Sequence, residues 1–309
     1  MAIQQEMWVR DIAENLFRDN TLLTRSLNDN AYLQGKVVHL PQSGAKPNVE
    51  VNRTTLPAVS AKRTDTEVTY NIDEYTTDPV TIQDTEEIET SYEKRQSVLS
   101  DQIMTLEERI MDQMLFNWGP SAASGSIVRT SGADRGGFKT GQTGTRKAVA
   151  KDDIIEIRRL MDRMDIPQSN RCLCVDADMY SDILKIEDFV RADQFGGNGN
   201  IQSGVVGRLY GFDVYTRSLV NTYDNAANPA KKAVGAAAAA TDNASCLAWH
   251  SGFVRMAMGS TNNGGIKVFE NPNDALYYGT VISAMVRAGG RPRYTDLKGV
   301  VALVEAAGA

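Results

Sequence analysis

The residues that could do chemistry are few and lie far apart along the chain. There are only two histidines, His39 and His250, and each falls in a segment that we expect to be a strand. Catalysis by a histidine needs a nucleophile, a carboxylate or a metal held beside it, and neither histidine has such a partner at a recognisable spacing. We therefore expect both to be structural or simply exposed.

The three cysteines suggest a core rather than a metal centre. Cys172 and Cys174 are two residues apart in an apolar run, which places both thiols on one face of a strand, and Cys246 is distant. A zinc site would need a second cysteine pair or a histidine at ligand spacing, so we expect no metal. Three scattered cysteines also give no disulfide framework, which indicates synthesis in a reducing compartment.

A glycine-rich loop, Phe195–Asn200, offers the remaining chance for ligand chemistry. Gly196, Gly197 and Gly199 could let a backbone approach a phosphate, but the Gly-Lys-Ser/Thr of a phosphate loop does not follow. A GxGxxG motif between a strand and a helix is missing too. An enzyme that binds a phosphate-bearing ligand through Gly197 stays open as a remote alternative, and we expect no cofactor.

Composition and charge exclude several classes of protein. The 309 residues carry a net charge of −6, whereas proteins that clamp nucleic acid are rich in Lys and Arg. No apolar run approaches the roughly 18 residues that cross a bilayer. Charged residues interrupt the first residues, where a secretory signal would be apolar. We expect a globular protein made in the cytosol, with no membrane contact and only loose contact with nucleic acid.

Two neighbouring segments differ in the spacing of their apolar residues. In Glu67–Asp73 every second residue is apolar, which predicts a half-buried strand. From Ile88 the apolar residues recur every three or four positions up to Gly119-Pro120, which predicts a helix over 89–118 of roughly 45 Å. The apolar positions of the strand pattern are Val68, Tyr70 and Ile72, with Val49, Val51, Val80 and Ile82 continuing it on either side of Pro57 and Pro79.

Shorter elements surround this pair of segments. We expect a mobile, basic loop over 121–150, and a helix that begins at Asp152 or Asp153. The other expected elements are an N-terminal helix carrying Trp8, Ile12 and Leu16; a buried strand 171–175 and a helix 176–186; strands 205–206 and 212–215 joined near Gly211; a surface excursion 221–242; a strand 246–249; a helical turn or two at 253–258; and strands 267–269, 277–286 and 300–304 that return to the long helix.

A two-stranded ribbon with one apolar face is marginal by itself in water, and so is a short terminal helix. We therefore expect neighbouring copies of the chain to cover both. The predicted inter-subunit contacts are Trp8, Ile12 and Leu16 on the N-terminal helix, and Val68, Tyr70 and Ile72 on the ribbon.

Residues 204–215 carry a resemblance to a known family. The run Gly207-Arg208-Leu209-Tyr210-Gly211-Phe212-Asp213-Val214 is similar to the Gly-x-Leu-x-Gly-Phe-x-Val signature in the axial domain of tailed-bacteriophage major capsid proteins. Other segments follow the order of that family over nearly the whole chain. The N-terminal helix resembles its N-arm, the ribbon resembles its E-loop, and 89–118 resembles its spine helix.

The resemblance implies an α+β chain with the Hong Kong ninety-seven-type capsid fold, in which an N-arm, an extended β-hairpin E-loop, a peripheral domain with a long spine helix and an axial domain follow one another. The implied divisions are 1–35 for the arm, 36–85 for the E-loop and flanking strands, 86–165 for the peripheral domain, 166–265 for the axial domain, and 266–309 for the return to the peripheral domain.

The resemblance also implies a function and partners. The chain would be the major capsid protein of a tailed bacteriophage and not an enzyme, assembled in the host cytoplasm into pentamers and hexamers of an icosahedral shell around double-stranded DNA. The axial loop with Phe195 and Gly197 would lie near the local symmetry axes. A separate scaffolding protein and a portal would be partners, and Lys62 could form an isopeptide cross-link as in some relatives. An encapsulin-like nanocompartment shell is the near alternative.

Overall fold

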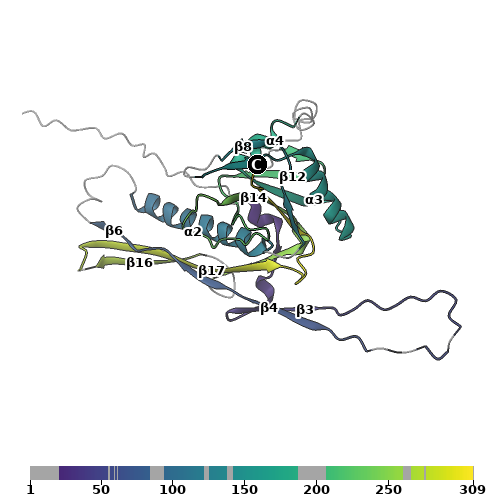
Figure 1. The fold of residues 1–309 in the computed structure, drawn as a ribbon. Coiled ribbons are helices and arrows are strands. Elements are labelled where there is room, and N and C mark those ends of the chain that lie inside the picture. Colours follow the sequence, from purple (N-terminus) through teal and green to yellow (C-terminus); the bar gives the residue numbers. More distant parts are fainter. Residues whose placement is uncertain are drawn as a thin grey trace, which may run out of the picture.

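The structure is a computed structural model that describes residues 21–54, 56–58, 60, 62–83, 94–121, 125–137, 142–186, 207–259, 266–274 and 276–308. Helices and strands mix in an α+β arrangement, and one long helix lies between two β-sheets (Figure 1).

The long helix, α2 (Lys94–Trp118), forms the centre of the molecule. Its 25 residues span about 38 Å at 1.5 Å per residue. It ends at Trp118, as predicted, because Gly119 and Pro120 follow; its predicted start at residue 89 lies outside the described residues. The side chains that it buries are Leu106, Ile110, Met111, Met114, Leu115 and Trp118.

A six-stranded sheet packs on one side of α2 and is built around its longest strand, β17. One edge of β17 pairs with β15 and β16, while the opposite edge pairs with β5 and β6. Ala284, Val286 and Ala288 alternate along β17 and face α2. The bounds are β1 (Leu27–Asn28), β5 (Asp73–Thr76), β6 (Val80–Gln83), β15 (Val254–Met258), β16 (Lys267–Asp274) and β17 (Gly279–Pro292).

A seven-stranded sheet packs on the other side of α2, in the order β11-β12-β10-β14-β18-β7, with β13 paired to β14. Every residue of β10 and β14 is buried, as expected for strands covered on both faces. The bounds are β7 (Ile127–Arg129), β10 (Arg171–Asp176), β11 (Gly207–Leu209), β12 (Phe212–Arg217), β13 (Thr222–Tyr223), β14 (Asn243–His250) and β18 (Val300–Val304).

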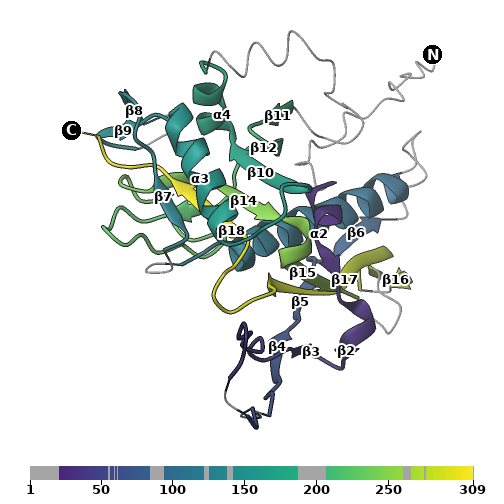
Figure 2. The same ribbon diagram turned by 90° about the vertical axis from the view of Figure 1, so that its right-hand side faces the viewer.

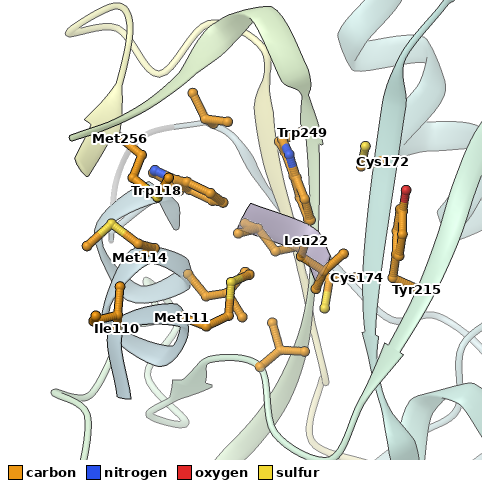
Figure 3. Close-up of a cluster of buried hydrophobic side chains, with 14 of the residues drawn as sticks. Leu22, Ile110, Met111, Met114, Trp118, Cys172, Cys174, Tyr215, Trp249 and Met256 are labelled. Carbon is orange, nitrogen blue, oxygen red and sulfur yellow. The ribbon is translucent and has the colours of Figure 1, made fainter. Parts of the chain in front are cut away.

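The two faces of this sheet belong to different cores. Cys174 and Trp249 point toward Met111 and Trp118 of α2, with Leu22 of the 3₁₀ helix η1 (Thr21–Arg25) among them (Figure 3). Alternate residues of the same strands point instead toward α3 (Lys151–Arg163) and α4 (Ala177–Ile183), which cover the far face (Figure 2). The layers are therefore α3 and α4, the seven-stranded sheet, α2, and the six-stranded sheet.

A third, three-stranded sheet forms the projecting ribbon. It consists of β2 (Leu33–Gln34), β3 (Val37–Gln42) and β4 (Thr66–Asn71), with 43–65 as the connection between β3 and β4. Figure 1 shows this connection extending far from the rest of the molecule. A small separate hairpin, β8 (Asp134–Gly136) and β9 (Thr145–Lys147), and the 3₁₀ helices η2 (Asn30–Tyr32) and η4 (Ser251–Phe253) complete the described elements.

Several local predictions are confirmed. The strand 171–175 is β10, and Asp176 caps α4 by accepting a hydrogen bond from the Asp178 N–H at 3.1 Å. The hairpin β11–β12 turns at Tyr210 and Gly211, both with positive φ (48° and 92°), as a two-residue turn between strands requires. The strands 246–249, 267–269 and 300–304 all form. The strand predicted at 277–286 begins only at Gly279, because Tyr277 and Tyr278 lie in the turn before it, and the strand predicted at 205–206 lies outside the described residues.

Other local predictions are wrong. Val49 and Val51 do not extend the ribbon, because the β3–β4 pairing ends at Gln42 and Thr66 and both valines are exposed. The helical turns predicted at 253–258 are mostly the strand β15, which pairs with both β1 and β17. Tertiary pairing here overrides the local sequence preference.

The segment 121–150 is not a loose basic loop. It contributes β7, β8 and β9, and its arginines bind the chain itself. The Arg135 side chain donates to the Asp182 carboxylate at 2.8 Å and to the Glu305 carboxylate at 2.6 Å, and both carboxylates are buried. The helix predicted to start at Asp152 or Asp153 is capped by Ala150, whose N–H donates to the Asp153 carboxylate at 2.8 Å.

Candidate subunit interface

The base of the ribbon has its own small core. Val38, Leu40, Tyr70 and Ile72 pack against Ala257 of β15, so the apolar face of the ribbon is covered within the chain. Ribbon and sheet approach closely, since a Cβ added to Gly289 would lie 2.6 Å from the Asn71 carbonyl oxygen. The ribbon base therefore does not depend on a neighbouring copy for its core, contrary to the expectation from the sequence.

The predicted contacts on the ribbon are Val68, Tyr70 and Ile72, and all three side chains are at most 9% exposed. Their contact with a neighbouring copy stays a prediction, and little of their area is left for it. The other predicted contacts, Trp8, Ile12, Leu16, Phe195 and Gly197, lie outside the described residues.

The connection 43–65 is the exposed part of the ribbon. Leu56 is 77% exposed, and Val49 and Val51 are exposed beside it. The segment carries four basic and two acidic residues in a chain that is acidic overall. Its charged residues are Lys46, Glu50, Arg53, Lys62, Arg63 and Asp65. An exposed, apolar and locally basic projection is suited to binding an acidic surface.

An acidic groove of about 760 Å³ runs along α2 beside β5 and β6. Glu74, Asp78 and Asp101 line it together with Arg109, and Arg287 pairs with the Glu74 carboxylate at 3.1 Å, so the acidic residues still exceed the basic ones by one. Apolar side chains such as Val80 and Leu106 also line it, together with threonines and Gln102. Burial raises the pKa of the Tyr75 hydroxyl on the same wall to about 12, so it stays neutral at physiological pH. This groove has the charge opposite to that of the ribbon connection.

The turn between β16 and β17 presents a second apolar surface. Leu276 is 83% exposed and Tyr278 is 81% exposed, with Tyr277 between them. Asp274 holds the turn, since its carbonyl oxygen accepts from the Tyr277 and Tyr278 N–H groups and its carboxylate accepts from the Leu276 N–H. Three consecutive large apolar residues that are exposed indicate a contact site. This triplet was not predicted from the sequence as a contact site, although Asn and Asp just before an apolar run are typical of a turn.

The residues considered for chemistry have structural roles. His39 pairs with the Glu67 carboxylate at 2.5 Å on the ribbon. His250 Nδ1 accepts from the Gly252 N–H at 3.0 Å, and burial together with nearby Arg171 lowers the pKa of its ring. Burial raises the pKa of the Cys172 thiol to about 12, which leaves it un-ionised and a poor nucleophile. All three cysteines are free and buried, as predicted.

Among the described residues, no group of three or more His, Cys, Asp or Glu side chains is arranged to hold a metal ion. In the same part of the chain, none of the helices combines the length and the hydropathy needed to span a bilayer. The Gly197 loop lies outside the described residues.

Comparisons with known proteins agree with this architecture. A profile of the phage capsid protein family matches residues 11–303. The capsid of cyanophage P-SCSP1u superposes with a TM-score of 0.66 at 17% identity, covering 99% of this chain and 94% of that one. The capsid of a native GTA particle superposes with a TM-score of 0.66 at 13% identity, covering 98% of this chain and 96% of that one. The chain from Mycobacterium phage Che8 superposes with a TM-score of 0.64 at 15% identity, covering 98% of this chain and 97% of that one.

The comparison with curated proteins gave no match. At these identities the structural similarity establishes the fold, which is that of phage capsids and was predicted as the Hong Kong ninety-seven type. The family profile extends over nearly the whole chain, from the residues before η1 to the end of β18. This chain therefore belongs to the phage capsid protein family.

Proposed function

We propose that the chain is the major capsid protein of a tailed bacteriophage, and that copies of it assemble as pentamers and hexamers into the icosahedral shell around a double-stranded DNA genome. The observation that carries this proposal is the ribbon connection 43–65, which projects from the folded body with exposed apolar and basic residues (Figure 1). Family membership supports the proposal, and so does the similarity to the capsids of cyanophage P-SCSP1u and of a GTA particle.

The ribbon supplies a specific contact in this proposal. The basic connection of one copy binds the acidic groove of a neighbour, which Glu74, Asp78 and Asp101 line. Exposed ion pairs contribute only about 0.2–1 kcal/mol each, so a single contact stays weak. A closed shell repeats the contact many times, and later contacts become effectively intramolecular.

The same layers suggest a division into domains. The six-stranded sheet with α2 would form the peripheral domain, and the seven-stranded sheet would form the axial domain. Since α3 covers the seven-stranded sheet, we place residues 151–165 with the axial domain rather than with the peripheral one. A scaffolding protein and a portal remain proposed partners, and the shell of the virion is the proposed location.

Contact with the packaged DNA would be weak. The net charge of −6 disfavours tight binding to phosphates, and Arg135 and Arg146 of the basic segment donate to groups of the chain itself.

A charge-swap experiment tests the function and the contact together. Lys46→Glu with Lys62→Glu reverses the charge of the connection, and Asp78→Lys with Asp101→Lys reverses that of the groove. Each pair is expected to lower the yield of closed shells, seen by electron microscopy and sedimentation of protein expressed with a candidate scaffolding protein. All four changes together are expected to restore the yield.

Arg163→Glu, at the exposed end of α3, is the matched charge control and is expected to leave the yield unchanged. A wild-type chain that stays monomeric with scaffolding protein present would refute the capsid function. Shells that form normally in both reversed pairs would keep the function and refute the proposed contact.

A further inference from the structure

One buried carboxylate joins three segments that are far apart in the sequence. Asp29 follows β1, and its side chain is 2% exposed. Its Oδ2 accepts from the Tyr70 hydroxyl of β4 at 3.1 Å, and its Oδ1 accepts from Arg255 Nη1 of β15 at 2.6 Å. Burial raises the pKa of this carboxyl, and the Arg255 guanidinium opposes that rise.

The backbone at Asp29 is tied to the sheet as well. The Asp29 N–H donates to the Met256 carbonyl oxygen at 2.8 Å, and β1 pairs with β15 through only two residues, Leu27 and Asn28. So short a strand has few hydrogen bonds of its own, and the side-chain bonds of Asp29 add to these backbone bonds in holding its end. The carboxylate therefore fixes both the end of β1 and the base of the ribbon.

The hydrogen bonds of Asp29 to Tyr70 and Arg255, hereafter the Asp29 joint, lie at the base of a long projection, so a small movement there is amplified at its far end. Tyr70 lies at the base of β4, and from there to residue 54 the chain reaches at most roughly 50 Å at about 3.3 Å per residue. A rotation of about 10° at the base moves the end of such an extended strand by up to about 9 Å. Small changes at Asp29 would redirect the whole connection.

Other restraints also act on the ribbon without involving β1, among them the packing of Tyr70 and Ile72 on Ala257 of β15. Arg291 Nη1 donates to the Thr69 carbonyl oxygen at 3.0 Å, and the ribbon backbone packs against Gly289. Both restraints hold the ribbon to β17. Among the side-chain hydrogen bonds that Tyr70 and the residues beside it make within the described part of the chain, the bond from Tyr70 to Asp29 is the one that links the ribbon to the end of β1.

We propose that Asp29 couples the position of β1 to the direction of the ribbon. Displacing the chain that leads into β1 would free the ribbon, and a load on the ribbon would loosen β1, since coupling between two sites is reciprocal. In a shell this would make the reach of the ribbon depend on how the N-terminal segment is held. That consequence rests on the proposed function; the coupling itself is a property of the single chain.

The test uses the full, unassembled chain. Spin labels on Asn48→Cys, in the connection, and Asp152→Cys, at the exposed start of α3, report the direction of the ribbon, and the buried native cysteines should not label. Tyr70→Phe removes only the hydroxyl that reaches Asp29, and Asp29→Asn removes the charge. Both are expected to broaden the distance distribution, and the double variant to broaden it no further than one change does.

Hydrogen exchange supplies the second readout. In Tyr70→Phe the Asp29 amide, on the β1 side of the joint, is expected to exchange about tenfold faster, because a bond to a charged group is lost. Amides of α2 are expected to keep their wild-type rates. Tyr32→Phe, which removes the hydroxyl of a half-exposed tyrosine in η2, is the matched control.

Two results would overturn the proposal. One is a distance distribution in Tyr70→Phe as narrow as that of the wild type, which would mean that the contacts with Ala257, Gly289 and Arg291 fix the ribbon without Asp29. The other is a broadened distribution with an unchanged Asp29 amide, which would confine the effect to the ribbon. Because Tyr70→Phe changes a single oxygen, the test remains decisive even if Asp29→Asn fails to fold.

Discussion

Gly290 of β17 is the position where one added methyl group should do the most damage to the central core. A Cβ on Gly290 would lie 2.7 Å from the Met114 sulfur, 2.7 Å from the Arg255 carbonyl oxygen and 3.1 Å from Trp118 Nε1. In the native structure Trp118 Nε1 donates to that same carbonyl oxygen at 3.1 Å. The methyl group of Gly290→Ala would therefore crowd both the donor and the acceptor of this hydrogen bond.

The expected loss combines two effects. Overpacking a well-filled core costs about 1–3 kcal/mol, and leaving the Trp118 N–H and its acceptor unpaired costs about 1–3 kcal/mol more. The side chain of Met114 can move to relieve part of the strain, but the backbone carbonyl oxygen cannot. We therefore expect Gly290→Ala to lower the free energy of unfolding by about 2–4 kcal/mol.

Urea unfolding followed by tryptophan fluorescence measures this loss and also reports on Trp118, whose ring lies 5.9 Å from that of Trp249. Gly136→Ala in β8 is the matched control, since a Cβ there meets no atom within 4 Å. The control is expected to change the unfolding free energy by less than about 0.5 kcal/mol. If Gly290→Ala were as stable as the control, the crossing of β17 and α2 would be looser than the structure shows.

Two further predictions concern buried charges. Lys231 Nζ donates to the carbonyl oxygens of Phe116 and Gly119 at the end of α2, and burial lowers its pKa from 10.5 to about 8. Between pH 8 and 10.5 the unfolded chain binds more protons at Lys231 than the folded chain does, so the free energy of unfolding of the wild type should rise with pH more than that of Lys231→Met. Urea denaturation of both proteins at pH 7.5 and 9.5 measures this difference. The same pH dependence in both proteins would contradict the prediction. Arg135→Met should lose about 3–5 kcal/mol in the same assay, because the buried Glu305 carboxylate loses its ion pair and the buried Asp182 carboxylate keeps only Lys185. Arg135→Lys should lose less, and a neutral Arg135→Met would contradict this reasoning.

Much of the fold could be predicted because its signals are local. The helix α2 has a long apolar periodicity that Gly119-Pro120 ends, and β10 is a continuous apolar run followed by a capping aspartate, Asp176. The turn at Gly211 needs a residue that tolerates positive φ, which the sequence supplies. Elements of this kind depend on their own residues, so spacing alone identifies them.

The rest depends on contacts between distant residues. The segment 254–258 becomes a strand because β17 and β1 lie beside it, and nothing within those five residues requires it. The ribbon acquires a core through Ala257, which is nearly two hundred positions beyond Tyr70 in the sequence. The acidic groove likewise forms only where α2 lies beside β5 and β6, so its charge could not be located from the sequence.

The burial of the ribbon base changes what neighbouring copies must supply. With Val68, Tyr70 and Ile72 covered by the chain's own residues, folding of the ribbon base does not require a partner. The most exposed large apolar residues lie at the tips, at Leu56 in the ribbon and at Leu276 and Tyr278 in the β16–β17 turn. Such a chain can fold first and assemble afterwards, because association then uses surfaces whose exposure does not destabilise the body.

Contacts made through such tips are small, and this suits a closed shell. If one tip contact contributed about −4 kcal/mol, two isolated copies would associate with only millimolar affinity. A misplaced copy held by one or two such contacts would dissociate quickly, whereas a correctly placed copy would make several contacts at once and be retained. The division of this chain into a self-sufficient layered core and exposed tips therefore favours assembly that corrects its own errors, and it requires that the direction of each tip be fixed from within the subunit.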